Sequence, residues 1–225
     1  MIVIKRGKEP NSLLKFRKEN PDADYESDMP TDVLKDIRKQ MWEEQRCLCA
    51  YCMKKIETPS VVRIEHCRPR HPQDEQEHDK KATLDFKWML GVCYGNSLVR
   101  GVKPEDKTCD AHRGNTELTV NPFDEMSVRK IKYKADGSIY SEDAEINKDV
   151  TETLNLNCQA LSLPQTRKNV LMAEKNRIMR KCRGKSQDAF MRELERTYAS
   201  LVQERNLTPY CGIIISWLES KLKIS

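Results

Sequence analysis

The chain lacks any long hydrophobic run. Residues 213–215 are three consecutive isoleucines, but a serine follows, whereas a membrane helix needs roughly 18 or more consecutive apolar residues. The first ten residues, M-I-V-I-K-R-G-K-E-P, turn charged after four positions and lack the apolar core of a secretory signal peptide. We therefore expect a cytoplasmic protein with no membrane span.

Phosphate-binding glycine motifs are also missing. Neither G-x-x-x-x-G-K-[ST] nor G-x-G-x-x-G occurs, so the chain is not expected to be an ATPase itself. Forty Lys and Arg against thirty-five Asp and Glu give a net charge of only +5. This excess permits contact with nucleic acid but does not demonstrate it. At 225 residues, the chain can bury a core without disulfide bonds, as one large domain or two small ones.

The chain has nine cysteines, which is an odd number, and no signal peptide is recognised, so a disulfide framework is not expected. Cys49 and Cys52, in C-A-Y-C, place two thiolates on one tight turn, and Cys93 and Cys109 complete a tetrahedral set suited to structural zinc. The alternative is a group of unrelated thiols. We expect the other five to be packed or surface thiols: Cys47, Cys67, Cys158, Cys182 and Cys211.

Between the two cysteine pairs lies an acid followed by a histidine, Glu65 and His66. The β-branched residues 60–64 predict a strand that delivers them, and Pro69 ends it. An imidazole, with an ordinary pKa of about 6.5, can take a proton from water near neutral pH. Glu65 and Asp110 can supply oxygen ligands to a catalytic Mg²⁺ or Mn²⁺ ion. The alternative is a structural or zinc-binding histidine.

Three arginines flank this pair as candidate phosphate contacts, with a solvated basic strand edge as the alternative. They are Arg63, Arg68 and Arg70. The polar segment 71–81 predicts a solvated loop, in which His71 and His78 are surface residues. His78 with Asp79 is the alternative there, as an accessory ligand pair.

The ordered set of L-C-A-Y-C, I-E-H-C-R-P-R, C-Y-G-N and C-D-A-H-R-G-N resembles the HNH (ββα-metal) endonucleases. Within that superfamily it is similar to the PtuB type of retron and Septu anti-phage systems. The resemblance covers this motif core and, more loosely, the N-terminal segment and the N-P-F that follows.

The resemblance implies a role for each motif residue. His66 is the general base, Glu65 the acidic residue before it, and Asp110 the final metal ligand, with His112 as the competing candidate. Arg113 stands where many relatives carry a lysine, and we expect it to contact nucleic acid. Relatives of the motif carry a central Asn that braces the loop of the catalytic His. Here Trp88 occupies that position, and Asn96 is the candidate to brace the His66 loop through a backbone hydrogen bond.

The implied function is a metal-dependent DNA endonuclease, the effector of an anti-phage defence system. Its implied partners are an ABC/SMC-like ATPase of the PtuA type and, in retron versions, a reverse transcriptase with its RNA–DNA product. Two alternatives remain open: a non-catalytic zinc knuckle that binds nucleic acid or a partner, and a stand-alone restriction-type HNH nuclease. The nuclease hypothesis requires the His66 ring to be accessible and close to Glu65 and Asp110.

Local patterns predict the remaining elements of the N-terminal half. Helical spacing of apolar residues predicts a helix over 31–46, with Thr31 as its N-cap, that packs on the zinc knuckle. Residues 11–30 read as irregular. The other expected elements are a strand over 2–4, a helical turn or buried connector over 84–90, a loop over 97–107 and a short helix from 110.

The second half begins with a β-hairpin over 128–140, turning at Asp136-Gly137. Helices are predicted over 149–156, 165–182, 187–203 and 210–222. These helices are expected to serve as scaffold or to dock a partner, with direct nucleic-acid contact as the alternative. The predicted fold class is α+β: a ββα-metal HNH core on a four-cysteine zinc knuckle with flanking helices in 1–120, and a hairpin with helices in 121–225.

Overall fold

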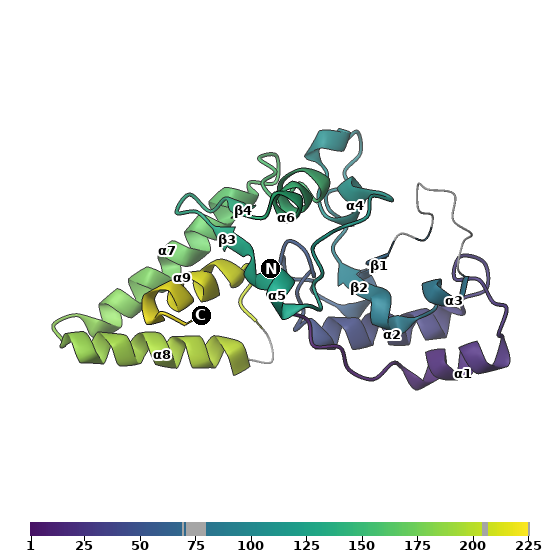
Figure 1. Cartoon of the computed structure of the whole chain (residues 1–225), viewed down its shortest axis with the longest axis horizontal. Coiled ribbons are helices and arrows are strands. Elements are labelled where there is room, and N and C mark those ends of the chain that lie inside the picture. Colours follow the sequence, from purple (N-terminus) through teal and green to yellow (C-terminus); the bar gives the residue numbers. More distant parts are fainter. Residues whose placement is uncertain (69, 71–79, 204–206, 225) are drawn as a thin grey trace.

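The computed structural model of the chain describes residues 1–68, 70, 80–203 and 207–224. It has a mixed α+β architecture in which two small antiparallel sheets lie among helices (Figure 1). The predicted Pro69, His71, His78 and Asp79 lie outside the described residues. None of the helices that the structure describes combines the length and apolar character needed to cross a membrane.

Two helices that pack against each other build the N-terminal part, α1 (Asn11–Glu19) and α2 (Thr31–Glu44). On α2 the predicted stripe is buried at Val33, Ile37 and Met41, at spacings of one helical turn. The helix begins at Thr31 as expected. Thr31 is not its cap, however, because Pro30 holds that position and makes no side-chain cap bond.

Two expectations for the first thirty residues are wrong. Residues 11–30 are not irregular throughout, since α1 forms there and buries Leu13 completely. Residues 2–4 form no strand. Instead Ile4 is buried and its N–H donates to the carbonyl of Pro122 at 2.9 Å, so the N-terminal segment is tied to a distant loop rather than to a sheet.

The first sheet pairs β1 (Arg63–His66) with β2 (Met89–Val92), and Glu65 lies opposite Leu90. The strand predicted over 60–64 therefore starts later, at Arg63, because a 3-10 turn at Pro59–Val61 precedes it. It contains Glu65 and His66 rather than ending before them. The predicted helical turn before Cys93 is a 3-10 turn at Phe86–Trp88 and leads into β2. Two short helices complete this part: α3 (Lys80–Thr83) and α4 (Asp110–Arg113), the latter as predicted.

The second sheet is the predicted hairpin, formed by β3 (Ile131–Tyr133) and β4 (Ile139–Ser141). Val128 belongs instead to a preceding helix, α5 (Glu125–Arg129). At the turn, Gly137 has φ +89°, and a Cβ atom there would lie 1.9 Å from the carbonyl oxygen of Pro164. Only glycine fits, because it combines the left-handed backbone with this close approach.

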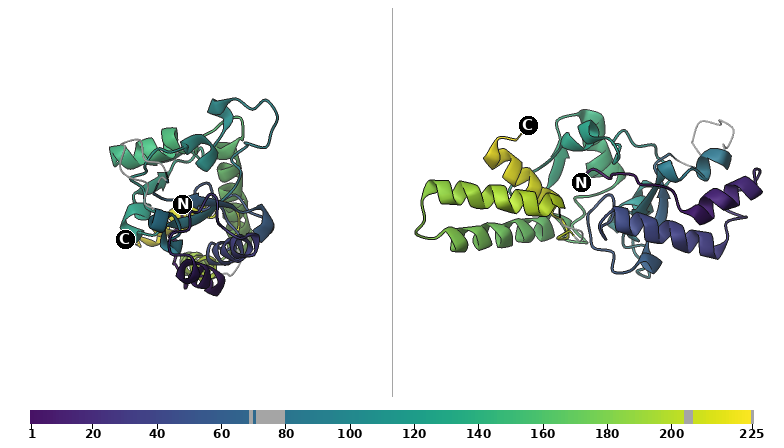
Figure 2. Two further views of the ribbon diagram at one scale, coloured as in Figure 1. Left: turned by 90° about the vertical axis from the view of Figure 1, so that its right-hand side faces the viewer. Right: turned by 90° about the horizontal axis from the view of Figure 1, so that it is seen from below.

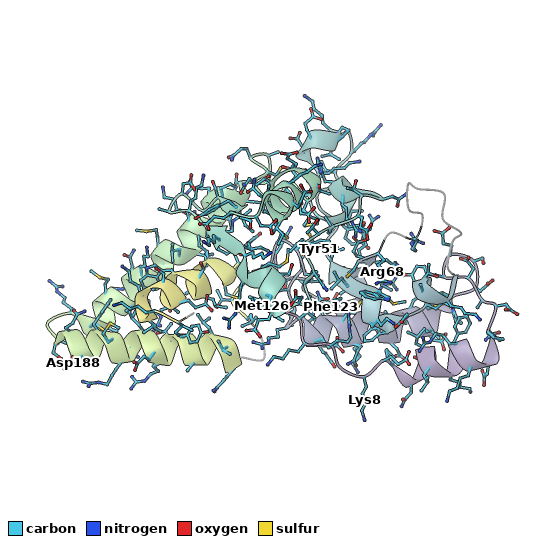
Figure 3. The ribbon with its side chains drawn as sticks, in the orientation of Figure 1. Lys8, Tyr51, Arg68, Phe123, Met126 and Asp188 are labelled. Carbon is cyan, nitrogen blue, oxygen red and sulfur yellow. The ribbon has the colours of Figure 1, made fainter. Side chains whose placement is uncertain are left out.

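Helices dominate the rest of the chain. They are α6 (Ala144–Lys148), a π-helix (Asp149–Thr153), α7 (Leu163–Cys182), α8 (Gln187–Gln203) and α9 (Gly212–Leu222). The predicted bounds of the last three hold within two residues. Helices α7 and α8 form an extended antiparallel pair that projects from the body, with Asp188 at its far tip (Figures 2 and 3).

Buried apolar side chains form two clusters. The first runs from Met1 to Leu156 and includes Cys49, Cys52 and Cys109, and the second lies among α7, α8 and α9. Leu48 and Met53, on either side of the C-A-Y-C turn, belong to the second cluster. This turn therefore contributes to both cores. The division into domains at residue 120 stays a prediction.

Candidate metal centre and catalytic site

The four predicted cysteines converge on one point. The Sγ–Sγ distances are 3.9 Å from Cys49 to Cys109, 3.7 Å from Cys52 to Cys93 and 3.8 Å from Cys93 to Cys109. A tetrahedral ion with Zn–S bonds of about 2.3 Å places its sulfurs about 3.8 Å apart. The four thiols therefore fit a bound metal such as zinc, as predicted, and no other such cluster of metal-binding side chains occurs among the described residues.

Buried backbone contacts position the C-A-Y-C turn against the first sheet. Gln45, which ends α2, donates its side-chain amide to the carbonyls of Leu48 and Gly91, and accepts from the Gly91 N–H at 2.7 Å. Across the cluster, the N–H of Cys109 donates to the Leu154 carbonyl at 2.9 Å. Hydrogen bonds from neighbouring thiols, Cys109 first, hold the pKa of Cys93 well below the usual thiol range. A thiolate suited to a metal is thus favoured there.

Glu65 lies beside this cluster, 6% exposed, on the face of β1 that meets α4. The Tyr51 hydroxyl donates to its carboxyl group at 3.1 Å, and Arg113 forms an ion pair with it. The carboxyl group of Asp110 is close enough to act on the pKa of Glu65. Burial first, and Asp110 second, raise the pKa of Glu65 to about 8, although Arg113 opposes the shift.

Asp110 occupies the first position of α4, where it also forms an ion pair with Arg63. Burial and the neighbouring Asp110 make the charged form of Glu65 less favourable, and Glu65 is therefore largely protonated at neutral pH. A hard divalent ion can replace that proton, because carboxylate oxygens are the ligands it prefers. The structure thus brings the two predicted metal-binding acids together.

Arg113 corrects one expectation. Its side chain is 1% exposed, so it cannot reach a phosphate in this conformation. It donates instead to the carbonyls of Thr116 (2.7 Å), His66 (2.9 Å) and Cys67 (2.8 Å), as well as to Glu65. The guanidinium fixes α4 to the end of β1, and its role is to hold the site together.

His66 is buried, with 6% of its surface exposed. Its Nε2 lies 2.9 Å from the Thr83 carbonyl oxygen, and because a carbonyl only accepts, Nε2 carries the proton and Nδ1 the lone pair. The Tyr25 ring packs edge-on against the imidazole, with centroids 4.5 Å apart. Burial lowers the pKa of His66 to about 4, so the ring is neutral at physiological pH.

The relation of His66 to the acid pair is indirect. Successive side chains of a strand point to opposite faces, so His66 faces Tyr25 while Glu65 faces α4. The charges of Asp110 and Arg113 nevertheless act on the pKa of His66. The ring therefore lies within electrostatic range of Asp110, but it is not accessible, so this condition of the nuclease hypothesis is not met in the present conformation. Access of a substrate to the ring requires the covering side chains to move.

The side chains of Asn96 and His112 form hydrogen bonds with backbone carbonyls away from Glu65 and His66. The Asn96 side-chain amide donates to the Asp106 carbonyl at 3.1 Å, so it braces the loop before Cys109 rather than the His66 loop. His112 Nδ1 lies 3.0 Å from the Thr153 carbonyl, which ties α4 to the π-helix. The bracing expected of Asn96 is provided to His66 by the carbonyl of Thr83.

The three flanking arginines all have partners. Arg63 pairs with Asp110, the Arg68 guanidinium lies 3.8 Å above the Trp88 ring, and Arg70 pairs with Glu26 at 2.5 Å. Arg63 and Arg68 remain accessible at the edge of the first sheet, where Figure 3 labels Arg68. The solvated basic edge and the phosphate contact are both compatible with this placement.

Sequence reasoning missed three contributors: Tyr25, Tyr51 and Thr83. Tyr51 had a signal, since it lies inside C-A-Y-C and must face either the metal or the neighbouring strand. Thr83 had none, because it acts through a backbone carbonyl, which every residue has. Tyr25 lies in the segment read as irregular, so nothing placed its ring near His66.

No protein-family model matches this chain, and no curated protein matches it either. The geometry of the site is therefore the basis for its interpretation, together with the motif resemblance.

Proposed function

We propose that the protein is a metal-dependent HNH (ββα-metal) endonuclease that hydrolyses DNA phosphodiester bonds. The observation that carries this proposal is the two ion pairs between β1 and α4, Arg113–Glu65 and Arg63–Asp110, which bring the buried Glu65 and the partly buried Asp110 to one seam. Arg113 is buried and stays with Glu65, whereas Arg63 is exposed. A divalent ion held by both carboxylates would take the place of Arg63.

The chemistry follows from these groups. Glu65 and Asp110 would hold Mg²⁺ or Mn²⁺, which supplies positive charge to the scissile phosphate and to the leaving 3′ oxygen. His66, held by Thr83 with Nδ1 unprotonated, accepts a proton from the attacking water. The four-cysteine site, loaded with zinc, fixes α4 relative to β1 and so keeps the two acids together. Tyr25 must move for DNA to reach the ring.

The resemblance also supports a role as effector of a retron or Septu-type defence system. On this proposal, an ABC/SMC-like ATPase of the PtuA type binds the protein, in retron versions together with a reverse transcriptase and its RNA–DNA product. The α7–α8 pair projects from the body and is the element proposed for such docking (Figure 1).

The test is nicking of supercoiled plasmid in Mg²⁺ or Mn²⁺, by the protein alone and with its ATPase partner. His66→Ala and Asp110→Asn should each reduce the rate at least 100-fold, since a general base contributes roughly 10²–10⁴-fold. His112→Ala is the matched control, because that imidazole also bonds a carbonyl but lies at the π-helix. Zinc content and thermal unfolding should confirm that each variant folds. Equal nicking by wild type and a folded His66→Ala protein would defeat the proposal.

A second candidate is a non-catalytic zinc module that binds nucleic acid or a partner. Two observations favour it: His66 is 6% exposed, and Trp88 stands at the usual Asn position under the Arg68 guanidinium. On this reading, His66→Ala leaves protection against phage intact. Cys49→Ala still abolishes it, because structural zinc contributes folding free energy directly.

A further inference from the structure

A cavity of about 220 Å³ opens in the C-terminal half, far along the chain from the candidate catalytic residues. Its walls come from the β3–β4 hairpin, α7 and α9. They combine aromatic, hydroxyl and basic side chains, among them Tyr133, Lys134, Lys175, Ser216, Trp217 and Ser220. Such a lining offers contacts to a flat, polar, negatively charged ligand.

The two lysines of this lining have no acidic partner among the described residues. Lys175 Nζ lies 5.1 Å above the Trp217 ring, and Lys134 Nζ lies 5.4 Å above the Tyr140 ring. Both are cation–π contacts, which neutralise no charge. A ligand with a phosphate group would therefore meet two cations that form no ion pair among the described residues, although the charge of Lys134 also acts on the pKa of Asp136.

Helix α7 extends this basic surface. It carries six basic residues and one acid, Glu174. The acid pairs with Arg177, and the buried Glu193 of α8 pairs with Arg177 and Lys181, so this side of α7 is compensated. On another side, Lys168 and Lys175 form no ion pair among the described residues.

That uncompensated side forms a continuous stripe. Lys168, Met172, Lys175 and Met179 follow at spacings of four, three and four, which place them on one face of α7, and Arg183 follows directly after the helix ends. Both methionines are unusually exposed, at 46% and 65%. At 1.5 Å per residue the helical stripe is about 16 Å long, which is enough for a few successive phosphates of an extended strand.

We propose that this surface binds single-stranded nucleic acid. Phosphates lie along the lysines of α7 and the hairpin, and one base enters the cavity beside Trp217. An acidic protein segment would use the cations equally well. It would not need an aromatic-lined cavity next to them, whereas a charged groove beside an aromatic wall is the usual arrangement for single strands. The proposal does not depend on the proposed nuclease function.

The test uses the full-length protein and a fluorescein-labelled oligothymidine of about 15 nucleotides, a length that spans such sites. Anisotropy is measured without added divalent ions, so that no cleavage contributes. A variant with Lys134→Gln, Lys168→Gln and Lys175→Gln should bind at least tenfold more weakly. Its slope of log affinity against log salt should be shallower by about 2, since each phosphate contact on a single strand contributes about 0.7.

The matched control removes three other exposed lysines that form no ion pair in the described part of the chain: Lys18→Gln, Lys35→Gln and Lys39→Gln. It should bind within twofold of wild type. Trp217→Leu should weaken binding about fivefold or more with an unchanged salt slope, because stacking is lost but no charge.

Equal losses in both lysine variants would overturn the proposal, since net charge alone would then explain binding. It would also fail if a labelled acidic peptide bound more tightly than the oligonucleotide and depended on Trp217, because the surface would then dock an acidic protein. Loss of nicking in His66→Ala with normal oligonucleotide binding would leave this inference standing, so the two proposals fail separately.

Discussion

Arg113 is the side chain that joins the most parts of the candidate site. Its guanidinium contacts Glu65, the carbonyls of His66 and Cys67, and the Tyr51 hydroxyl at 3.3 Å. A lysine would supply the charge but not the fork of donors that reaches several acceptors at once. Arg113 is therefore a structural pin of the candidate site.

Replacing this pin should be costly. Arg113→Gln leaves buried acceptors unpaired and Glu65 without its cation, so we expect the free energy of unfolding to fall by about 3–5 kcal/mol. Urea denaturation followed by circular dichroism measures the loss. Arg100→Gln, at an exposed position, should change stability by less than about 0.5 kcal/mol. Similar values for the two variants would show that the buried network is not formed.

The raised pKa of Glu65 predicts how the proposed binding of a divalent ion depends on pH. With a pKa of about 8, Glu65 is protonated at pH 6, and a divalent ion must displace that proton. Mn²⁺ affinity should therefore rise about tenfold per pH unit from pH 6 towards pH 8 and then level off. His66, with a pKa of about 4, stays neutral throughout and does not contribute.

Calorimetry in buffers of different ionisation enthalpy measures both the affinity and the proton released. Asp110→Asn removes the second carboxylate and should abolish most of the binding. An affinity that does not vary between pH 6 and pH 8 would contradict the raised pKa of Glu65.

At the scale of elements, the hairpin turn has little freedom because it presses on the start of α7. Gly137→Ala adds a Cβ atom 1.9 Å from the Pro164 carbonyl oxygen and 2.9 Å from the backbone nitrogen of Lys168. Gly101→Ala is the matched control, since Gly101 also has a positive φ, +74°, but open space around it.

We expect the control to lose about 1 kcal/mol of stability, from backbone strain alone. Gly137→Ala should lose at least about 2 kcal/mol more, because the hairpin and α7 must separate. Thermal unfolding compares the two variants. Equal losses would show that the turn does not contact α7 in solution.

Sequence patterns identified elements that carry their own signal. Amphipathic spacing gave α8 and α2, and Asp136-Gly137 gave the hairpin, because these depend on local periodicity or turn chemistry. Strand β2 was missed because all four of its residues are buried, which removes the alternation that marks a half-exposed strand. Helix α1 was missed because its burial depends on one leucine that packs among distant residues.

The residues of the candidate site divide in the same way, into those with a local sequence signal and those without one. Metal-ligand spacing predicted the four cysteines, and the acids that flank them followed from their position in the chain. Arg113 was expected to contact nucleic acid on the motif resemblance alone. Its buried partners Glu65 and His66 lie 48 and 47 residues earlier in the chain, so they reach it only when β1 and α4 are docked. The Thr83 carbonyl had no sequence signal at all.

At the scale of the whole molecule, the C-A-Y-C turn connects two cores. Leu48 and Met53 pack with α7–α9, while the cysteines between them pack with the N-terminal cluster. The Tyr210 N–H also donates to the Met53 carbonyl at 2.9 Å, just before α9 begins. An ion on the cysteines therefore stabilises more than its own loop.

Metal removal should consequently be felt in α9. We expect chelation of bound zinc to raise amide hydrogen exchange at Tyr210 and in the first turn of α9 at least tenfold, along with exchange at the C-A-Y-C turn. Mass spectrometry of pepsin fragments measures this, and re-addition of zinc should restore protection. Rapid exchange confined to the cysteine turn would show that the two cores are independent.

The stretch between Cys93 and Cys109 has a practical consequence. Both its ends are anchored at one point by the thiol cluster, while its outer part carries the exposed Leu98 and Val99, at 75% and 56%, and Gly101 in open space. Such a ring can change in length without disturbing what lies beneath its base. An epitope tag or fluorescent label inserted after Arg100 should leave folding intact.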